Sequence, residues 1–155
     1  HFAEAGNPVI GICNGFQVLT EAHLLPGALI RNAKLKFLCQ TVHVQVQDSV
    51  CQWLDAPAGA TFDIPISHHD GNYTCSADDL CRLQEGNQIV LRYCDADGQV
   101  RPGSAPNGSL ENIAGICNAA GNVFGLMPHP ERVVDGVSGT TQGQAFFQAI
   151  AQRFE

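Results

Sequence analysis

The chain has 155 residues, of which 45% are hydrophobic and 15% are charged. This size and balance are typical of one compact domain, not of a disordered segment. The formal net charge is −7 with only 8 Lys and Arg residues, which argues against nucleic-acid binding and against attraction to an anionic membrane. No apolar run approaches the roughly 20 residues that a membrane span needs.

The seven cysteines indicate a reducing compartment. Their number is odd and no two stand at C-x-x-C spacing, so the sequence indicates neither a disulfide framework nor a structural zinc site. We expect a cytoplasmic protein whose cysteines are mostly small core residues; six of the seven need no functional explanation, and the seventh has to be argued for separately.

The first residues have the character of a helix end. The chain has no initial Met and opens at His1 in a short segment that Gly6 would terminate. We therefore expect residues 1–155 to be a single domain and an N-terminally truncated part of a longer chain.

The predicted elements, in chain order, mix buried strands with helices. We expect strands at 9–12, 41–47, 62–66 and 89–94, a hairpin of 113–117 with 123–127, and helices at 16–22, 76–85 and 140–154. A polar loop is expected at 67–72. This mixture favours an α/β fold with helices covering a sheet.

Two of the predicted helices carry further signals. Ser76 should cap the helix that follows it, with Asp79 three residues later in capping-box register. The last helix should bury its apolar side chains, which are Phe146, Phe147, Ile150 and Phe154.

The run Gly11-Ile12-Cys13-Asn14-Gly15 has the G-x-nucleophile-x-G pattern of a sharp turn from strand to helix. Glycines are expected on both sides of Cys13 because the two backbones nearly touch there. The helix N-terminus would favour the thiolate of Cys13, and the N–H of Asn14 would point at an oxyanion. Gln17, one helical turn on, could reach the same pocket. The alternative is that Cys13 is a buried core thiol in a tight turn. A partner base elsewhere in the sequence is needed to favour the nucleophile over this alternative.

The run Met127-Pro128-His129-Pro130-Glu131-Arg132 follows an apolar strand directly. Two prolines would keep the segment extended, which places His129 and Glu131 on the same side of the chain. A neutral imidazole backed by a carboxylate is the base that a thiol nucleophile needs. The alternative is a Pro-rich turn with a solvated His and Glu, but the coincidence with Cys13 favours a Cys-His-Glu triad.

These two runs resemble the signatures of class I (triad) glutamine amidotransferases. The segment from Pro106 to Ile116, which includes Asn107, Gly108 and Ser109, resembles more specifically the glutaminase subunits of phosphoribosylformylglycinamidine synthase. The resemblance covers nearly the whole chain. It implies a three-layer, mostly parallel, flavodoxin-like sheet with helices on both faces, here lacking the N-terminal strands and the Gly-rich loop that supplies a second oxyanion donor in the family.

The resemblance also implies a reaction and partners. Cys13 would attack the amide of L-glutamine to give a thioester and ammonia, with His129 and Glu131 serving both half-reactions. The ammonia would pass to a synthetase subunit that uses ATP and Mg²⁺ in purine biosynthesis, and a small third subunit would bridge the two. No cofactor is implied in this domain.

Four further residues are candidates for supporting roles at the site. The loop with His68 and His69 could be read as a metal cluster, but we expect no metal because no second ligand group stands at zinc spacing. The resemblance places His68 on the active-site side, and places Asn107, Gly108 and Ser109 near glutamine or the partner. An ordinary turn is the alternative for these three residues.

The sequence leaves three other functions open. The chain could be an amidotransferase for another acceptor, which the 106–116 segment argues against. It could be a thiol hydrolase or peptidase, which the Pro-His-Pro-Glu spacing argues against. It could also be an inactive binding module.

Overall fold

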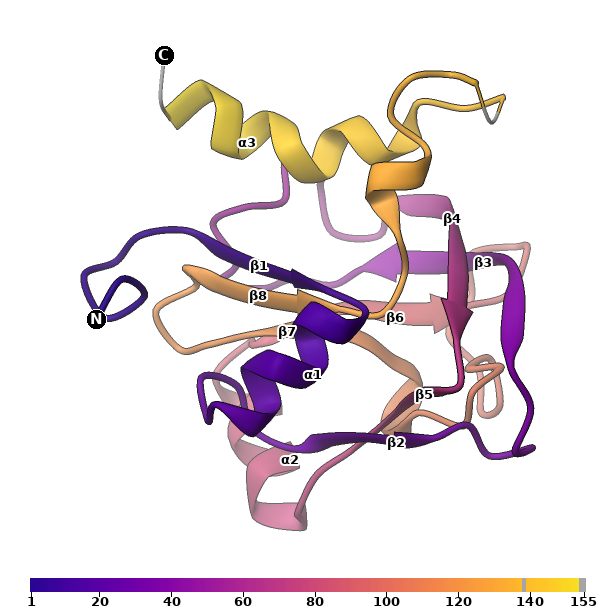
Figure 1. The fold of residues 1–155 in the computed structure, drawn as a ribbon, viewed down its shortest axis with the longest axis horizontal. Helices are drawn as coiled ribbons and strands as arrows, with labels where there is room; N and C mark the ends of the chain where they lie inside the picture. The colour runs from indigo at the N-terminus through magenta and orange to yellow at the C-terminus, as the bar shows by residue number, and fades with distance from the viewer. Residues whose placement is uncertain (138, 154–155) are drawn as a thin grey trace.

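The computed structural model describes residues 1–137 and 139–153. Its main sheet has six strands in the order β1-β8-β7-β6-β3-β4 (Figure 1). The strands of this sheet are β1 (Val9–Ile12), β3 (Leu38–Val46), β4 (Thr61–His68), β6 (Ile89–Cys94), β7 (Ile113–Cys117) and β8 (Val123–Leu126). A separate antiparallel pair joins β2 (Ala28–Arg31) to β5 (Asp70–Thr74).

Helices cover both faces of the main sheet, as expected for a three-layer α/β fold. Figure 1 shows α3 (Ala145–Arg153) on one side of the sheet, and α1 (Asn14–Glu21) and α2 (Ala77–Glu85) on the other. The core is divided in the same way. Phe146 of α3 packs into one apolar cluster with β3, β4 and β6, whereas Phe16 and Leu83 pack into a second cluster under α1 and α2.

The strand directions are mixed rather than mostly parallel over the described residues. Only β1 and β8 pair in parallel, whereas β8–β7, β7–β6, β6–β3 and β3–β4 are antiparallel. The connection from β7 to β8 is short, and a short connection can join only antiparallel neighbours, because a parallel pair needs a long crossover. The parallel pair is the one that carries the candidate site.

Most predicted elements are present, with differences at their ends. The helix at 76–85 is α2, and its capping box is confirmed: the Asp79 N–H donates to Ser76 Oγ at 3.0 Å. The strands at 9–12 and 89–94 and the antiparallel hairpin of β7 with β8 are confirmed. β2 was not predicted; three of its four residues are exposed and one is half-buried, so the strand has no alternation of buried and exposed side chains.

The conformations predicted for two segments were wrong. Residues 67–72 are not a loop but the end of β4 and the start of β5, because backbone pairing with β3 and β2 outweighs the polar character of the segment. The segment after Pro128 is not extended either. Pro130–Arg132 form a 3₁₀ turn, which is compatible with proline because Pro130 stands at the first helical position.

The last helix begins later than predicted, at Ala145, after a 3₁₀ turn at Gln142–Gln144. Phe146 is buried and Phe147 is half-buried. The predicted burial of the Ile150 side chain and of Phe154 lies outside the described residues. Within the described ranges, no helix is long and apolar enough to cross a membrane.

The cysteines are less uniformly internal than expected. All seven are free thiols, and Cys94 and Cys117 are buried core residues. Cys39 and Cys81 are exposed, so these two depart from the expectation that the thiols are mostly core residues. β3 and α2 each place one cysteine on a solvent-facing position, where a small polar residue would serve equally well.

Candidate active site

Cys13 lies at the sharp turn between β1 and α1. Its backbone has φ 52° and ψ −105°, a strained conformation for a residue with a side chain. The turn is held by the Cys13 N–H, which donates to the Leu126 carbonyl of β8 at 2.8 Å. A Cβ added to Gly11 would lie 2.6 Å from the backbone carbonyl of Gly15, so the expected close approach of strand and helix is present. No atom lies within 4 Å of a Cβ added to Gly15, so the second glycine is not needed for space.

The parallel pairing of β1 with β8 brings the second predicted run to the same edge of the sheet. Ile12 stands opposite Leu126, so Cys13 and the segment that contains His129 leave the sheet at the same level. The N–H of His129 donates to the Pro65 carbonyl of β4 at 2.8 Å, which fixes the segment from its other side. Two runs that are more than 100 residues apart in sequence therefore meet because of strand register.

His129 and Glu131 are in contact, as predicted. The Nδ1 of His129 lies 2.6 Å from Glu131 Oε1. Since a carboxylate only accepts hydrogen bonds, Nδ1 carries the proton in the neutral ring, and Nε2 is left as the acceptor. His129 is 8% exposed, and its Nε2 is buried without a hydrogen-bond partner among the described residues. The ring is thus oriented as a general base with a free acceptor nitrogen.

Cys13 and His129 line one cavity of about 530 Å³. Its lining residues are Ile12, Cys13, Asn14, Gln17, Phe37, Ser67, His68, His69, Asp70, His129 and Arg132. The predicted hydrogen bond between Cys13 and His129 is not formed, because His129 Nε2 has no partner and the Cys13 thiol instead donates to the Ser67 carbonyl at 3.9 Å. The two groups therefore line the same cavity without a hydrogen bond between them.

The protonation state of Cys13 differs from the expectation. Burial raises the pKa of the Cys13 thiol above its ordinary value, and this outweighs the lowering by the backbone N–H of Asn14 and by the charge of Arg132. The carboxylate of Glu131 raises it further. The expected thiolate at the helix N-terminus is therefore not the resting form, and Cys13 needs a base.

Three of the predicted binding residues line the cavity, namely Asn14, Gln17 and His68. Asn14 is the first residue of α1, and its backbone N–H is directed at the Cys13 sulfur, where it favours the charged form. Gln17 lies one turn further on and donates from Nε2 to the Asp70 carbonyl at 3.2 Å. This bond holds β5 against α1 and leaves the Gln17 Oε1 free to accept from a ligand.

His68 also lines the cavity and is 4% exposed. Burial lowers its pKa to about 4, and the charge of nearby His129 lowers it as well. The ring is therefore neutral at pH 7. It rests against Gly71, where an added Cβ would lie 2.2 Å from the ring.

Asn107, Gly108 and Ser109 are not brought into the cavity. Asn107 is fully buried and donates to the Gly71 carbonyl at 2.7 Å and to the Tyr93 hydroxyl at 3.1 Å. Ser109 accepts from the Tyr73 N–H at 3.0 Å. The two side chains hold β5, whose Gly71 lies against the His68 ring, and neither of them lines the cavity.

The sequence reasoning missed four residues at this site. Arg132 and Phe37 line the cavity, and Asp70 shares its wall. Asn32 lies behind His68 and is 1% exposed. Arg132 adjoins the predicted Glu131, so its position in the motif was a usable signal. Asn32 and Phe37 flank the unpredicted turn after β2, and no local pattern marks them.

No group of three or more His, Cys, Asp or Glu side chains is placed to hold a metal ion within the described part of the chain. His68 and His69 stand next to each other in sequence, but no carboxylate or thiol completes a ligand set around them.

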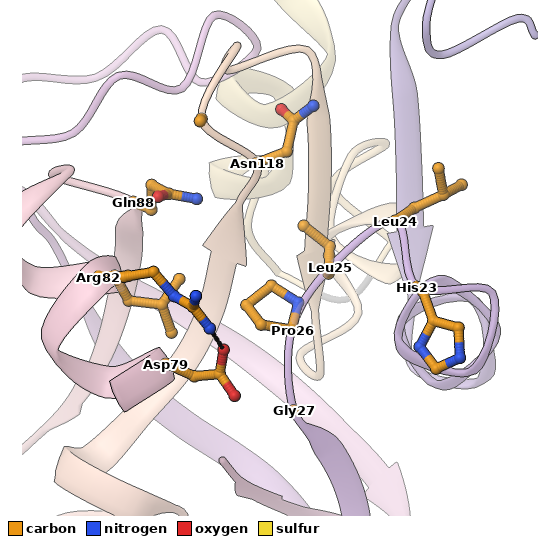
Figure 2. Close-up of a pocket in the computed structure, with 11 residues that line it drawn as sticks. His23, Leu24, Leu25, Pro26, Gly27, Asp79, Arg82, Gln88 and Asn118 are labelled. Atoms are coloured by element: carbon orange, nitrogen blue, oxygen red, sulfur yellow. Dashed lines mark hydrogen bonds and ion pairs between the residues drawn. The ribbon is translucent and has the colours of Figure 1, made fainter. Parts of the chain in front are cut away.

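A second cavity, of about 470 Å³, lies at the other end of β8, beyond the C-terminus of α1. Figure 2 shows His23, Pro26 and Asn118 on its walls, with the guanidinium of Arg82 paired to Asp79. It contains none of the predicted site residues. Its two charged residues are paired with each other, and neither Cys13 nor His129 lines it.

Comparison with known proteins agrees with the geometry of the first cavity. Residues 1–151 match the CobB/CobQ-like glutamine amidotransferase domain family, and the chain belongs to this family. The resemblance found in the motifs is thereby confirmed.

Two individual relatives show which members of this family the chain is similar to. The chain is 52% identical over 149 residues to "Phosphoribosylformylglycinamidine synthase subunit PurQ" of Acaryochloris marina, covering 96% of this chain and 63% of that protein. It is 55% identical over 155 residues to the protein of the same name from Thermosynechococcus vestitus, covering 96% and 64%.

A solved structure, "Structure of PurLQS from Thermotoga maritima", matches with a TM-score of 0.82 and 39% identity, over 99% of this chain and 65% of that chain. The match confirms the class I amidotransferase fold. The chain spans less than two thirds of the length of these relatives.

Proposed function

We propose that the chain is a glutaminase that hydrolyses L-glutamine to glutamate and ammonia through a Cys13-His129-Glu131 triad. The observation that carries the proposal is the state of His129. Its Nδ1 is held by Glu131 at 2.6 Å, while its Nε2 is buried and unpaired in the cavity that Cys13 also lines. A base with a fixed tautomer and a free acceptor nitrogen beside a thiol is the arrangement for acyl transfer.

The reaction follows from these groups in two half-reactions. In the first, the Cys13 thiol leaves the Ser67 carbonyl and gives its proton to His129 Nε2, and the sulfur attacks the amide carbon. The tetrahedral intermediate collapses as the C–N bond breaks, and the nitrogen takes the proton from His129 to leave as ammonia. A thioester to Cys13 remains.

The second half-reaction restores the enzyme. Water gives a proton to His129 Nε2 and attacks the thioester carbon. The C–S bond breaks, the sulfur takes the proton back, and glutamate is released. Glu131 stabilises the imidazolium in both halves without accepting the proton. The backbone N–H of Asn14, which interacts with the Cys13 sulfur at rest, would stabilise the oxyanion in both intermediates.

The acceptor and the partners are also part of the proposal. The PurQ relatives are named as subunits of phosphoribosylformylglycinamidine synthase. We infer that the ammonia passes to a synthetase subunit in de novo purine biosynthesis, which makes the chain the amido-donor half of an ATP-dependent carbon-nitrogen ligase. That subunit would use ATP and Mg²⁺, a small third subunit would bridge the two, and the assembly would be cytoplasmic.

Steady-state release of glutamate from glutamine tests the chemistry. Cys13→Ser should lower kcat by about 10³-fold or more, because the hydroxyl is a far weaker nucleophile beside the same base. Cys39→Ser is the matched control, since Cys39 is exposed and outside the cavity. Equal activity of the two variants would exclude Cys13 as the nucleophile.

The partner is tested by the same assay with and without a synthetase subunit bound to its nucleotide. No hydrogen bond joins Cys13 to His129 in this structure. Docking that brings the two together would raise kcat with a smaller change in KM, because the gain is made in the transition state. Full activity of the chain alone, unchanged on adding the partner, would contradict this.

A further inference from the structure

The amide of Asn32 has one possible orientation. Its Oδ1 accepts from the backbone N–H of Gly71 at 3.1 Å, and a backbone N–H can only donate. Its Nδ2 donates to the Lys36 carbonyl at 2.8 Å and to the His68 carbonyl at 2.9 Å. A flipped amide would set donor against donor and acceptor against acceptor at all three contacts.

The orientation of Asn32 determines which nitrogen of His68 carries the proton. His68 Nδ1 lies 3.1 Å from Asn32 Oδ1, which only accepts, so Nδ1 must be the N–H donor. In the neutral ring the other nitrogen, Nε2, is then an acceptor without a proton. Burial, which lowers the pKa of His68 to about 4, keeps the ring in this neutral form at pH 7.

The described residues supply no hydrogen-bond donor to Nε2 of His68. It is buried without a hydrogen-bond partner, in a residue that lines the same cavity as Cys13. His129 Nε2 is in the same state. These two are the only buried side-chain nitrogen or oxygen atoms without a partner in the described structure. Because unsatisfied buried acceptors are costly and rare, the cavity is suited to a ligand that brings N–H donors.

We propose that His68 is the specificity residue that selects the amide of the substrate over the acid: its Nε2 accepts a hydrogen bond from the carboxamide N–H₂ of glutamine. This inference rests on the proposed glutaminase function. One N–H of the carboxamide nitrogen would meet Nε2 of His68, while Nε2 of His129 stays available to take the proton of Cys13. A carboxylate has no N–H and would bring a lone pair against Nε2 of His68.

The same property has a consequence for product release. Glutamate differs from glutamine at the reacting group, where an oxygen replaces the N–H₂. A fixed acceptor therefore binds the substrate and repels the product. Sites that hydrogen-bond an N–H of the substrate reject analogues that lack it much more strongly than apolar pockets reject a change of size.

Two substitutions separate this role from packing. His68→Asn keeps an amide near the position of Nδ1, within reach of Asn32, but has no atom at the position of Nε2. His68→Gln can place an amide oxygen near the position of Nε2. The first should lose the recognition and the second should rescue it. Dissociation constants are measured by calorimetry for glutamine and for glutamate, in the full chain carrying Cys13→Ala to prevent turnover.

The expected result is a change in the ratio of the two constants. His68→Asn should weaken glutamine binding by about tenfold and leave glutamate binding unchanged or tighter. His68→Gln should keep glutamine binding within about threefold of the parent. An unchanged ratio in His68→Asn would overturn the inference and leave the glutaminase function intact. Absence of glutamine binding in the parent would overturn both.

The tautomer is measured without any substrate, in the unsubstituted chain. A long-range ¹H–¹⁵N spectrum, with His68 assigned by its loss in His68→Asn, should show a protonated Nδ1 and an unprotonated Nε2. A protonated Nε2 would overturn the inference even in a protein that hydrolyses glutamine, because that nitrogen could then only donate.

Discussion

Replacing Gly11 with alanine should disable the site from a position that no ligand touches. The new Cβ would lie 2.5 Å from Leu19 Cδ1 and 2.6 Å from both the carbonyl carbon and oxygen of Gly15. Ordinary contact begins near 3.4 Å, so the start of α1 would have to move away from β1 by about 0.8 Å, and the Cys13 turn would move with it. A misplacement of about 1 Å at a reacting group costs on the order of 10²-fold in rate.

The same clash has a cost in stability. Over-packing of this kind destabilises by roughly 1–3 kcal/mol, and here the obstacle includes backbone, which relaxes less readily than a side chain. We expect Gly11→Ala to lower kcat for glutamine about 10²-fold and to lower the melting temperature measurably. Gly15→Ala is the control, because a Cβ there meets nothing within 4 Å and alanine favours the helix.

The assay is glutamate release together with thermal unfolding of the three proteins. Gly15→Ala should retain most of its activity and be as stable as the parent or more so. Equal damage from both substitutions would show that the motif needs its glycines for another reason than space. A fully active Gly11→Ala would show that the turn tolerates movement and that the position of Cys13 is not fixed by this contact.

Three further predictions follow from the site. Glu131→Gln, which keeps the shape but removes the charge behind His129, should lower kcat by about 10²–10⁴-fold with little change in KM; a loss confined to KM would contradict the orienting role. Asn107→Ala should destabilise the fold by roughly 2–3 kcal/mol in urea unfolding, because it removes the buried hydrogen bonds of Asn107 to the Gly71 carbonyl, the Tyr93 hydroxyl and the Ser109 N–H. A change in glutamine KM without loss of stability would show direct contact with substrate. Because burial raises the pKa of Cys13, its alkylation by iodoacetamide in the free chain should still accelerate above pH 9.0, and a rate that levels off below pH 9.0 would indicate a thiolate at rest.

Local sequence patterns predicted much of the fold. The apolar run before Cys13, the hairpin of β7 with β8 and the capping box of α2 depend on residues close in sequence, and each was found. The errors lie where pairing between distant strands decides the structure. Residues 67–72 are polar enough for a loop, yet they become strand because β3 and β2 supply backbone partners.

The reactive groups were predictable because each stands in a short motif. Cys13 needed its glycine for a measurable steric reason, and the prolines around His129 marked a rigid turn, although its conformation was misjudged. The predicted contact of His129 with Glu131 is nevertheless present, because a 3₁₀ turn also brings residues two apart within reach.

The supporting residues were not predictable in the same way. Asn32 acts through the orientation of its amide, which depends on partners 36 and 39 residues away in sequence. Asn107 was expected near glutamine or the partner, and its contacts are with Gly71 and Tyr93 behind the cavity wall. Burial, which sets the protonation of Cys13, is likewise a property of the packed molecule and not of the motif.

The most direct test of the account is to find which cysteine an electrophilic glutamine analogue modifies. The chain offers seven free thiols, and two of them, Cys39 and Cys81, are more accessible than Cys13. Peptide mapping by mass spectrometry after brief treatment at neutral pH should show the label on Cys13 alone, with protection by glutamine. Label spread over the exposed cysteines, with Cys13 unmodified, would contradict the assignment of Cys13 as the nucleophile and of its cavity as the glutamine site.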